Sequence, residues 1–465
     1  MNKNEVFSSL PPEWPDDLLP AIQAQVAASQ RKIVVLDDDP TGTQTVHDIP
    51  VLTEWSVNLL HTELLNDGPA FYILTNSRSM PLPAAQTLNR EIGHNLMLAS
   101  AQSGRSFVVV SRSDSTLRGH YPGETDALAA AIETQVDATL LIPFFLEGGR
   151  YTINDVHYVA EGEQLAPAAE TPFARDAAFG YQHSNLREWV AEKTGGRIGA
   201  EAVASISLDE IRVGGPGRVA EKLLTLMQGT ACIINAVSMR DVQVFVLGLL
   251  QAEAQGKKFL YRTAASFVQV RAGLTARPLL TPTDLALPQT GGGLVVVGSY
   301  VPKTTGQLAE LLALPGVASC ELRVANLLDA STRAVEIERA AQVVSQALQQ
   351  SQDVVVYTSR DLVTGQNAEH SLSIGQQVSD SLVALVRTLK TQPRYLLAKG
   401  GITSSDIATK GLGVRRALVL GQILPGVPLW RTGAESLYPG LAYIVFPGNV
   451  GDAHALARVV TTLKQ

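Results

Sequence analysis

Short apolar segments alternate with longer helical segments along most of the chain. Apolar runs such as 32–36 (KIVVL), 107–111 (FVVVS) and 353–357 (DVVVY) have the length and β-branched content of buried strands. Segments between such runs, for example 338–350 (ERAAQVVSQALQQ), have a helical period. Continuous apolar strands that alternate with helices are typical of parallel sheets covered on both faces. The sequence therefore predicts an α/β fold with mainly parallel sheets flanked by helices.

The domain organisation is indicated by a stretch rich in Pro, Thr and Gly at 276–293, after which a new series of strands and helices begins. We therefore expect an N-terminal extension at 1–30, a first domain at 31–280 and a second domain at 291–465, with a cleft between the two domains. The polar stretch at 151–187 has few periodic signals. We expect it to be a long functional excursion made of loops and short elements.

The composition argues against several classes of protein. The 465 residues carry a formal net charge of −7, whereas nucleic-acid binders usually have a basic face. The only cysteines, Cys232 and Cys320, suggest neither a disulfide framework nor a zinc cluster. The N-terminus lacks the features of a signal peptide, and no apolar run is as long as a transmembrane helix. We therefore expect a cytoplasmic protein that binds neither nucleic acid nor membranes.

Polar residues follow several predicted strands of the first domain. Three consecutive aspartates, Asp37, Asp38 and Asp39, end the first apolar run, and later runs are followed by polar groups at 75–78, at 112–118 and at Arg150. Ligands of doubly wound sheets bind beyond the carboxyl ends of the strands. Arginines there could hold a carboxylate, while hydroxyl and carboxylate groups sort substrate hydroxyls. One aspartate could act as a general base and another could hold Mg²⁺. The pattern predicts a pocket for a small polyhydroxylated anion.

A structural role is the alternative for each of these residues, because polar groups at strand ends often only cap the next helix. Asp39 precedes Pro40 and could simply form the turn. A turn needs only one aspartate, however, so three in a row favour a functional role for at least one. His47, His120 and His157 have no metal-ligand spacing, and we interpret them as structural residues or peripheral substrate contacts.

Glycine-rich turns follow three predicted strands of the second domain. They contain residues 400–401, Gly448 with Asn449, and Gly298 with Ser299. Free backbone N–H groups at such turns and at helix N-termini form natural phosphate sites. Each turn alone is an ordinary connection from strand to helix, but three in one domain favour a nucleotide site. A hydroxy-acid pocket in one domain and phosphate-binding turns in the other suggest phosphoryl transfer across a cleft.

Six motifs follow one another along the chain, namely DDPTG at 38–42, TNSR at 75–78, DSTLRG at 114–119, GGITS at 400–404, PGVPL at 425–429 and PGNVG at 447–451. In these motifs the chain resembles the four-carbon acid sugar kinase family, formerly a family of unknown function, whose members act on threonate, erythronate or oxo-tetronate. The resemblance covers nearly the whole chain from Ile33 onward. It implies that the N-terminal domain binds the acid sugar and that the C-terminal domain binds ATP.

The expected site residues form three groups. The catalytic candidates are Asp38 and Asp39. The expected substrate contacts are Asp37, Asp38, Arg78, Arg112, Ser113, Asp114, Ser115 and Arg118. The expected nucleotide contacts are Ser266, Gly298, Ser299, Gly400, Gly401, Ile402, Thr403, Ser404 and Gly448. Ser266 rests on the resemblance alone. Asp37 is not part of the family motif, and we interpret it as a pointer to this protein's own substrate. No metal ligand is assigned.

The expected function is that of an ATP- and Mg²⁺-dependent kinase that phosphorylates a hydroxyl of a sugar acid of about four carbons, such as a tetronate or oxo-tetronate. The alternative is a non-catalytic sensor that binds an acid metabolite and a nucleotide. A nicotinamide dehydrogenase is disfavoured because no GxGxxG motif follows a strand. Lys399 stands where many relatives have an uncharged residue, and we hypothesise that it contacts a phosphate. A homodimer is included among the expected assemblies, although no motif specifies it.

Overall fold

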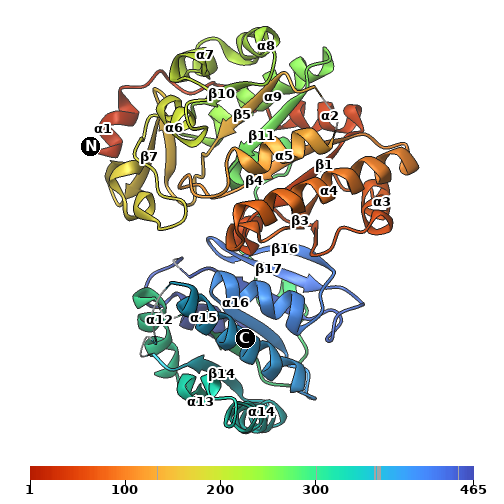
Figure 1. Ribbon diagram of the computed structural model, residues 1–465, viewed down its shortest axis with the longest axis vertical. Helices are drawn as coiled ribbons and strands as arrows, with labels where there is room; N and C mark the ends of the chain where they lie inside the picture. Colours follow the sequence, from red (N-terminus) through yellow and green to blue (C-terminus); the bar gives the residue numbers. More distant parts are fainter. Residues whose placement is uncertain (133–134, 300, 361–362, 364–367, 449, 465) are drawn as a thin grey trace. The chain divides into compact units, whose positions relative to one another are not determined.

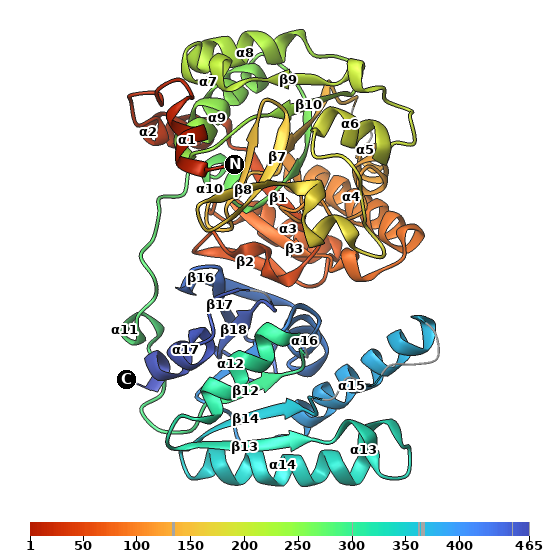
Figure 2. The same cartoon turned by 90° about the vertical axis from the view of Figure 1, so that its left-hand side faces the viewer.

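The computed structural model describes residues 1–132, 135–299, 301–360, 363, 368–448 and 450–464, so Asn449 lies outside the described residues. The chain forms two compact units (Figure 1). The first comprises Met1–Val46 and Glu54–Ala276, and the second comprises His47–Thr53 and Arg277–Gln465. Each unit contains a mainly parallel sheet with helices packed on it (Figures 1 and 2). The predicted α/β fold is confirmed.

The sheet of the first unit is parallel, and its strands lie in the order β3-β1-β4-β11-β5-β10-β9. The bounds are β1 (Lys32–Asp37), β3 (Ala70–Leu74), β4 (Phe107–Arg112), β5 (Ala138–Ile142), β9 (Ala204–Ile206), β10 (Thr230–Ile234) and β11 (Phe259–Thr263). The central strands are apolar without alternation because both faces of the sheet are covered. All six residues of β1 are buried, including its two charged ends.

Helices cover this sheet in two groups. The first group is α3 (Val57–Leu65), α4 (Leu82–Ser103) and α5 (Gly123–Ala131), and the second is α2 (Leu19–Ser29), α7 (Leu208–Arg212), α8 (Gly215–Thr225), α9 (Met239–Ala254) and α10 (Ala265–Arg271). Figure 2 shows α4 and α5 on one side of the strands and α2 and α9 on the other. Local sequence fixes the ends of these helices. Ser238 and Asp241 form a capping box at the start of α9, and Gly104 ends α4 in a left-handed conformation.

The polar stretch after β5 carries a small antiparallel sheet. Its strands are β6 (Arg150–Ile153), β7 (Val156–Glu161) and β8 (Gln164–Pro167), followed by the 3₁₀ turns η3 (Ala168–Glu170) and η4 (Pro172–Arg175) and by α6 (Leu186–Lys193). The helix α1 (Lys3–Ser8) lies beside this sheet, since the Lys3 amide donates to the Glu163 carbonyl at 2.8 Å. The stretch therefore has its own hydrogen-bonded frame.

The sheet of the second unit has the order β13-β14-β12-β15-β18-β17-β16-β2, in which the first five strands are parallel and the last three are antiparallel to their neighbours. The bounds are β2 (Ile49–Leu52), β12 (Leu294–Val297), β13 (Val317–Leu322), β14 (Asp353–Thr358), β15 (Tyr395–Lys399), β16 (Arg416–Leu424), β17 (Val427–Thr432) and β18 (Ala442–Phe446). Strand β2 of this unit thus comes from a part of the sequence that lies between two segments of the first unit.

The helices of the second unit are α11 (Pro282–Leu285), α12 (Pro302–Leu312), α13 (Val324–Leu328), α14 (Arg333–Gln349), α15 (Ala368–Thr388), α16 (Gly401–Asp406) and α17 (Ala455–Lys464). Pairs such as α12 with α17 and α14 with α15 pack against each other over the sheet. The core beneath α12 and α17 includes Leu308, Val459, Val297 and Ile444, all buried. Across the parts of the chain that the structure describes, no helix combines the length and apolarity needed to span a membrane.

Candidate active site

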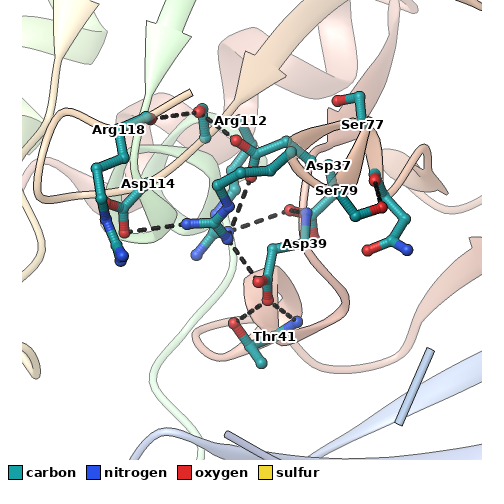
Figure 3. A network of polar contacts seen from close by, with 12 residues as sticks. Asp37, Asp39, Thr41, Ser77, Ser79, Arg112, Asp114 and Arg118 are labelled. Atoms are coloured by element: carbon teal, nitrogen blue, oxygen red, sulfur yellow. Dashed lines mark hydrogen bonds and ion pairs between the residues drawn. The ribbon is translucent and has the colours of Figure 1, made fainter. Parts of the chain in front are cut away.

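The carboxyl ends of β1, β3 and β4 lie side by side. The strand register pairs Asp37 with Leu74 of β3 and with Arg112 of β4. The residues that follow these three strands therefore share one edge of the sheet, as expected for a doubly wound fold. Figure 3 shows the resulting polar network, which joins Asp37, Asp39 and Asp114. The structure thus brings together the three strand-end groups that the sequence singled out.

Asp37 is buried and pairs with Arg112. Its Oδ1 lies 3.1 Å from Nη1 of Arg112, and the two residues are 1% and 5% exposed. Burial raises the pKa of the Asp37 carboxyl to about 7, and the negative charges of Asp38 and Asp39 add to this increase. The positive charge of Arg112 lowers the pKa but does not cancel the effect of burial. The neighbouring turn approaches closely, because a Cβ atom on Gly42 would lie 1.9 Å from Oδ2 of Asp37. These contacts give Asp37 a place within the packing of the sheet edge.

Asp38 holds a carboxylate oxygen that no hydrogen bond satisfies. The Ser113 hydroxyl donates to Oδ2, whereas Oδ1 is buried and accepts no hydrogen bond in the described part of the chain. The nearest cation is Arg78, whose Nη2 lies 3.6 Å from Oδ1. An unsatisfied buried carboxylate oxygen is costly unless something else binds it. Asp38 is therefore poised to accept a proton or a cation.

Arg78 bridges three carboxylates. Its Nη2 lies 2.6 Å from Oδ2 of Asp39 and 3.6 Å from Asp38, while Nη1 lies 3.3 Å from Oδ1 of Asp114. Burial alone would raise the pKa of both Asp39 and Asp114, but the Arg78 charge and the hydrogen bonds to each carboxylate together lower the pKa of both. The Thr41 hydroxyl and amide add hydrogen bonds to Asp39. Both carboxyl groups are therefore ionised at neutral pH.

Asp114 also anchors Arg118, whose Nε donates to Oδ2 at 2.8 Å. The guanidinium of Arg118 lies over the ring of Phe173, with 5.2 Å to the centroid, and that of Arg150 lies 5.5 Å from the same centroid. Such contacts stabilise cations near aromatic faces. Phe173 belongs to η4 of the polar stretch, so this stretch contributes a wall to the cluster.

Ser115 is held through its backbone by a buried histidine. His157 is 0% exposed, and its Nε2–H donates to the Ser115 carbonyl at 2.8 Å. The Ser115 carbonyl can only accept, so Nε2 carries the ring hydrogen and Nδ1 is left as an acceptor. The Thr152 hydroxyl therefore donates to Nδ1 at 3.0 Å. Burial lowers the pKa of His157 to about 4, so the ring is neutral. His120 likewise binds the Met80 carbonyl at 2.9 Å. These contacts support the structural interpretation of both histidines.

Arg262 is a residue that the sequence reasoning missed. It lies on β11, is 4% exposed, and its Nη2 donates to the Arg118 carbonyl at 2.8 Å. A Cβ atom on Gly119 would lie 3.7 Å from this Nη2 and 3.2 Å from Oδ2 of Asp38, so the guanidinium lies close to the acid cluster. A charged residue inside the apolar run at 259–263 was the available signal.

Ser266 lies in the first unit, on α10. It is fully buried, and the Leu146 amide donates to its hydroxyl at 3.2 Å. The structure therefore places Ser266 behind the loop that follows β5. Its predicted contact with the nucleotide stays a prediction.

The glycine turns of the second unit converge at the carboxyl ends of β12, β15 and β18. A Cβ atom on Gly298 would lie 2.3 Å from Oγ1 of Thr403, and one on Gly400 would lie 3.1 Å from Cβ of Ser299. Gly448 lies close to the same point, because a Cβ atom on it would lie 3.8 Å from the Ser299 hydroxyl oxygen. Gly400 has a φ of 119°, which favours glycine. The described residues of the three predicted turns therefore lie around one point.

Two residues in the first turn of α16 differ in their surroundings. Ser404 is fully buried, and its hydroxyl donates to the Gly400 carbonyl at 2.6 Å, so it supports the turn. Ile402 is 61% exposed. Gly401 begins α16, whose first amide groups have no partner within the helix. Amides in such positions can bind phosphate oxygens.

Lys399 is fully buried beside these turns. Its Nζ donates to the carbonyl groups of Pro447 at 2.6 Å and Gly448 at 3.2 Å, and it lies 4.1 Å from the centroid of the Phe446 ring. Burial, and secondarily the ammonium of Lys303, lower the pKa of Lys399 to about 7. In the structure the Lys399 side chain therefore binds the backbone of the turn after β18.

The described residues contain no cluster of three or more His, Cys, Asp or Glu that could hold a metal ion. Mg²⁺ needs only one or two protein carboxylates when substrate phosphates supply other ligands. The unsatisfied oxygen of Asp38 meets that requirement.

Two family models match the chain, a sugar-binding N-terminal domain over residues 33–271 and a nucleotide-binding C-terminal domain over residues 294–456. The chain belongs to the four-carbon acid sugar kinase family. The family predicted from the sequence motifs is therefore confirmed. The description of each domain agrees with the type of site that the sequence predicts for that part of the chain.

One relative of the chain is a 3-oxo-tetronate kinase from Cupriavidus necator. It is 27% identical to this chain, and the match covers 78% of this chain and 80% of the relative. A 3-oxo-isoapionate kinase from Paraburkholderia graminis is 27% identical over 47% of this chain, and the match spans about half (52%) of that protein's length. A crystal structure of a Haemophilus influenzae protein from a domain family of unknown function has a TM-score of 0.63 at 19% identity, over 92% of this chain and 100% of that one. This structural likeness shows a shared fold.

Proposed function

We propose that the protein is an ATP-dependent kinase that phosphorylates a hydroxyl group of a small sugar acid, of about four carbons, such as a tetronate or oxo-tetronate. The observation that carries this proposal is the carboxylate of Asp38, which has one oxygen fixed by Ser113 and the other without a hydrogen bond. A carboxylate that is oriented and unsatisfied suits a general base for a substrate hydroxyl.

Cations of the first unit would bind the substrate carboxylate. Arg118 and Arg150 flank Phe173 and are partly exposed, and Arg150 has no ion-pair partner within the described ranges. Their guanidinium groups suit a planar carboxylate. Arg78 already binds three carboxylates, so its proposed part is to orient Asp39 and Asp114 and to present a remaining donor to the substrate. Ser113 and Ser115 complete the proposed set of hydroxyl contacts.

Asp38 would accept the proton of the attacking hydroxyl, after which the oxygen attacks the γ-phosphorus of ATP and ADP leaves. Asp39 is less suited to this role, because Arg78 and Thr41 occupy its oxygens. Asp37 is proposed to act through Arg112 by fixing the strand ends. Bound Mg²⁺ would neutralise charge on the transferred phosphoryl group. Because the unsatisfied oxygen of Asp38 would take up the proton, Asp39, after displacement of Arg78, is the carboxylate that could bind the ion.

The nucleotide would bind at the turns of the second unit. Gly298, Ser299, Gly400, Thr403 and Gly448 surround one point, and small residues let phosphate oxygens approach backbone amides. In catalysis of this kind most of the rate enhancement comes from positioning and from neutralising charge. The proposal requires the phosphate to meet the substrate hydroxyl during turnover.

The test is a coupled assay of ADP release with a panel of four- to six-carbon sugar acids and their oxo derivatives. We expect ATP-dependent turnover with at least one four-carbon acid, and none after Asp38→Asn. Calorimetry with the same panel serves as the second measurement. Binding of an acid and of ATP with no turnover across the panel would favour a sensor and overturn the kinase proposal.

A further inference from the structure

Arg360 lies beside the glycine turns and was not singled out from the sequence. It follows β14 by two residues, and β14 is the neighbour of β12 in the parallel sheet, with Val297 opposite Tyr357. The turn at Gly298 and Ser299 is thus flanked on one side by β15, which leads to Gly400, and on the other by β14, which leads to Arg360.

The Arg360 guanidinium is fixed at one end and unsatisfied at the other. Its Nη2 donates to the Ser299 carbonyl and to the Thr305 hydroxyl, each at 2.8 Å. Its Nε and Nη1 are buried and have no hydrogen-bond partner in the described part of the chain. The side chain as a whole remains partly exposed.

Arg360 also lacks a counter-ion within the described ranges. Arg112 and Arg78 of the first unit each lie within ion-pair distance of a carboxylate, whereas Arg360 has no carboxylate at that distance in the part of the chain that the structure describes. An arginine stays protonated even where burial opposes its charge. A partly buried cation without a partner is costly, and an anionic ligand removes that cost.

A second basic residue lies at the same turns. Lys399 binds the carbonyl groups of Pro447 and Gly448 through Nζ. The Thr304 hydroxyl, a donor to the Ser299 hydroxyl at 3.2 Å, lies 3.4 Å from the Gly448 carbonyl and so links the two turns. The guanidinium of Arg360 and the amine of Lys399 thus lie beside one group of small residues, as expected where a polyphosphate binds.

We propose that Arg360 is a phosphate ligand of the nucleotide site, with Nε and Nη1 donating to phosphate oxygens while Nη2 keeps the Ser299 turn in place. This inference rests on the proposed function, since it assumes that the second unit binds ATP. It adds a residue from a strand that carries none of the family motifs quoted above. The alternative is that Arg360 only supports the turn at Ser299.

The test compares the wild type with Arg360→Gln, Arg360→Lys and the control Arg458→Gln, a half-exposed arginine that pairs with Asp452 on the surface. Calorimetry with ATP, ADP and adenosine measures the dissociation constants. We expect Arg360→Gln to raise those for ATP and ADP about 10- to 100-fold, the range for hydrogen bonds between charged groups. The constant for adenosine, and the KM for the sugar acid, should stay unchanged. Arg458→Gln should match the wild type.

The outcomes separate the two proposals. If the wild type binds no ATP, the proposed function fails. If the wild type binds ATP and Arg360→Gln binds it equally well, the phosphate contact is overturned. Equal weakening of ATP and adenosine would show that Arg360 only supports the turn. If Arg360→Gln melts at a much lower temperature than the wild type, Arg360→Lys decides whether the phosphate contact exists. Lysine keeps the charge but lacks the planar guanidinium, so under the proposal it should still weaken ATP binding at least about threefold.

Discussion

A Cβ atom placed on Gly42 would lie 1.9 Å from Oδ2 and 2.1 Å from Oδ1 of Asp37. Asp37 cannot move aside, because its carboxylate pairs with Arg112 and is 1% exposed. The φ angle of Gly42 lies outside the left-handed region, so backbone conformation does not require glycine there. Glycine is required because there is no space for a side chain. The close approach fixes the position of the intervening aspartates.

Gly42→Ala should destabilise the protein by about 1–3 kcal/mol, the usual cost of overpacking a buried site. Thermal melting with and without sugar acid measures the effect, and kinase activity should fall because Asp38 shifts. Gly68→Ala is the matched control, since a Cβ atom there meets only the Ala70 carbonyl at 4.0 Å. Equal melting temperatures for the two variants would show that the turn relaxes without cost.

Asp38→Asn should lower kcat by about 10²- to 10⁴-fold, the range for loss of a general base, while the melting temperature stays close to that of the wild type. Asparagine keeps the shape of the side chain and the contact with Ser113, but it cannot take up a proton. Asp126→Asn is the control, because that residue pairs with Arg197 at the surface. Near-normal turnover of Asp38→Asn would refute its role as base.

The sequence predicted the strands and the edge of the sheet at which the polar groups gather. Apolar runs without alternation gave β1 and β4, and the rule for doubly wound sheets placed Asp37 and Arg112 at the same edge. The direct pairing of Asp37 with Arg112 depends on the register between β1 and β4. Neither apolar run contains a signal that specifies this register. Arg262 was missed because a charge inside an apolar run was interpreted as part of a buried strand.

The assignment of β2 could not be predicted from local sequence either. Its four residues, Ile49–Leu52, form an ordinary short apolar run. Their partner, β16, begins at Arg416, so the pairing joins segments more than 360 residues apart. The Asp48 amide donates to the Val419 carbonyl at 2.7 Å, and Asp48 pairs with Arg277. Such contacts depend on the tertiary fold, and no periodicity within the run signals them.

Arg78→Lys should raise the KM for the sugar acid at least about tenfold and leave the KM for ATP unchanged. A lysine ammonium is a single point charge and cannot bridge Asp39 and Asp114 as the planar guanidinium does. The two carboxylates would then repel each other within the pocket. Arg90→Lys, on the exposed surface of α4, is the control. An unchanged KM for the acid would show that Arg78 has no part in substrate binding.

Asp37→Asn should change how stability depends on pH. The folded pKa of Asp37 is raised to about 7, so between about pH 4 and 7 the folded protein binds a proton that the unfolded chain releases. The wild type therefore loses stability as pH rises through this window, by at most about 1.4 kcal/mol per pH unit, and Asp37→Asn lacks this loss. Denaturant unfolding at pH 5 and pH 7.5 measures the difference. Parallel changes in the wild type, Asp37→Asn and the exposed control Asp67→Asn would contradict the prediction.

Lys399→Met should have a pH dependence of the opposite sign. The folded pKa of Lys399 is lowered to about 7, so between about pH 7 and 10 the unfolded chain binds a proton that the folded protein lacks. The wild type should gain stability relative to Lys399→Met as pH rises through this window, by at most about 1.4 kcal/mol per pH unit. A neutral amine keeps two N–H groups, enough for the Pro447 and Gly448 carbonyls. Lys390→Met, at an exposed position, should follow the wild type in denaturant unfolding. If the stability of Lys399→Met changes with pH in the same way as that of the wild type, Lys399 is charged throughout this pH range.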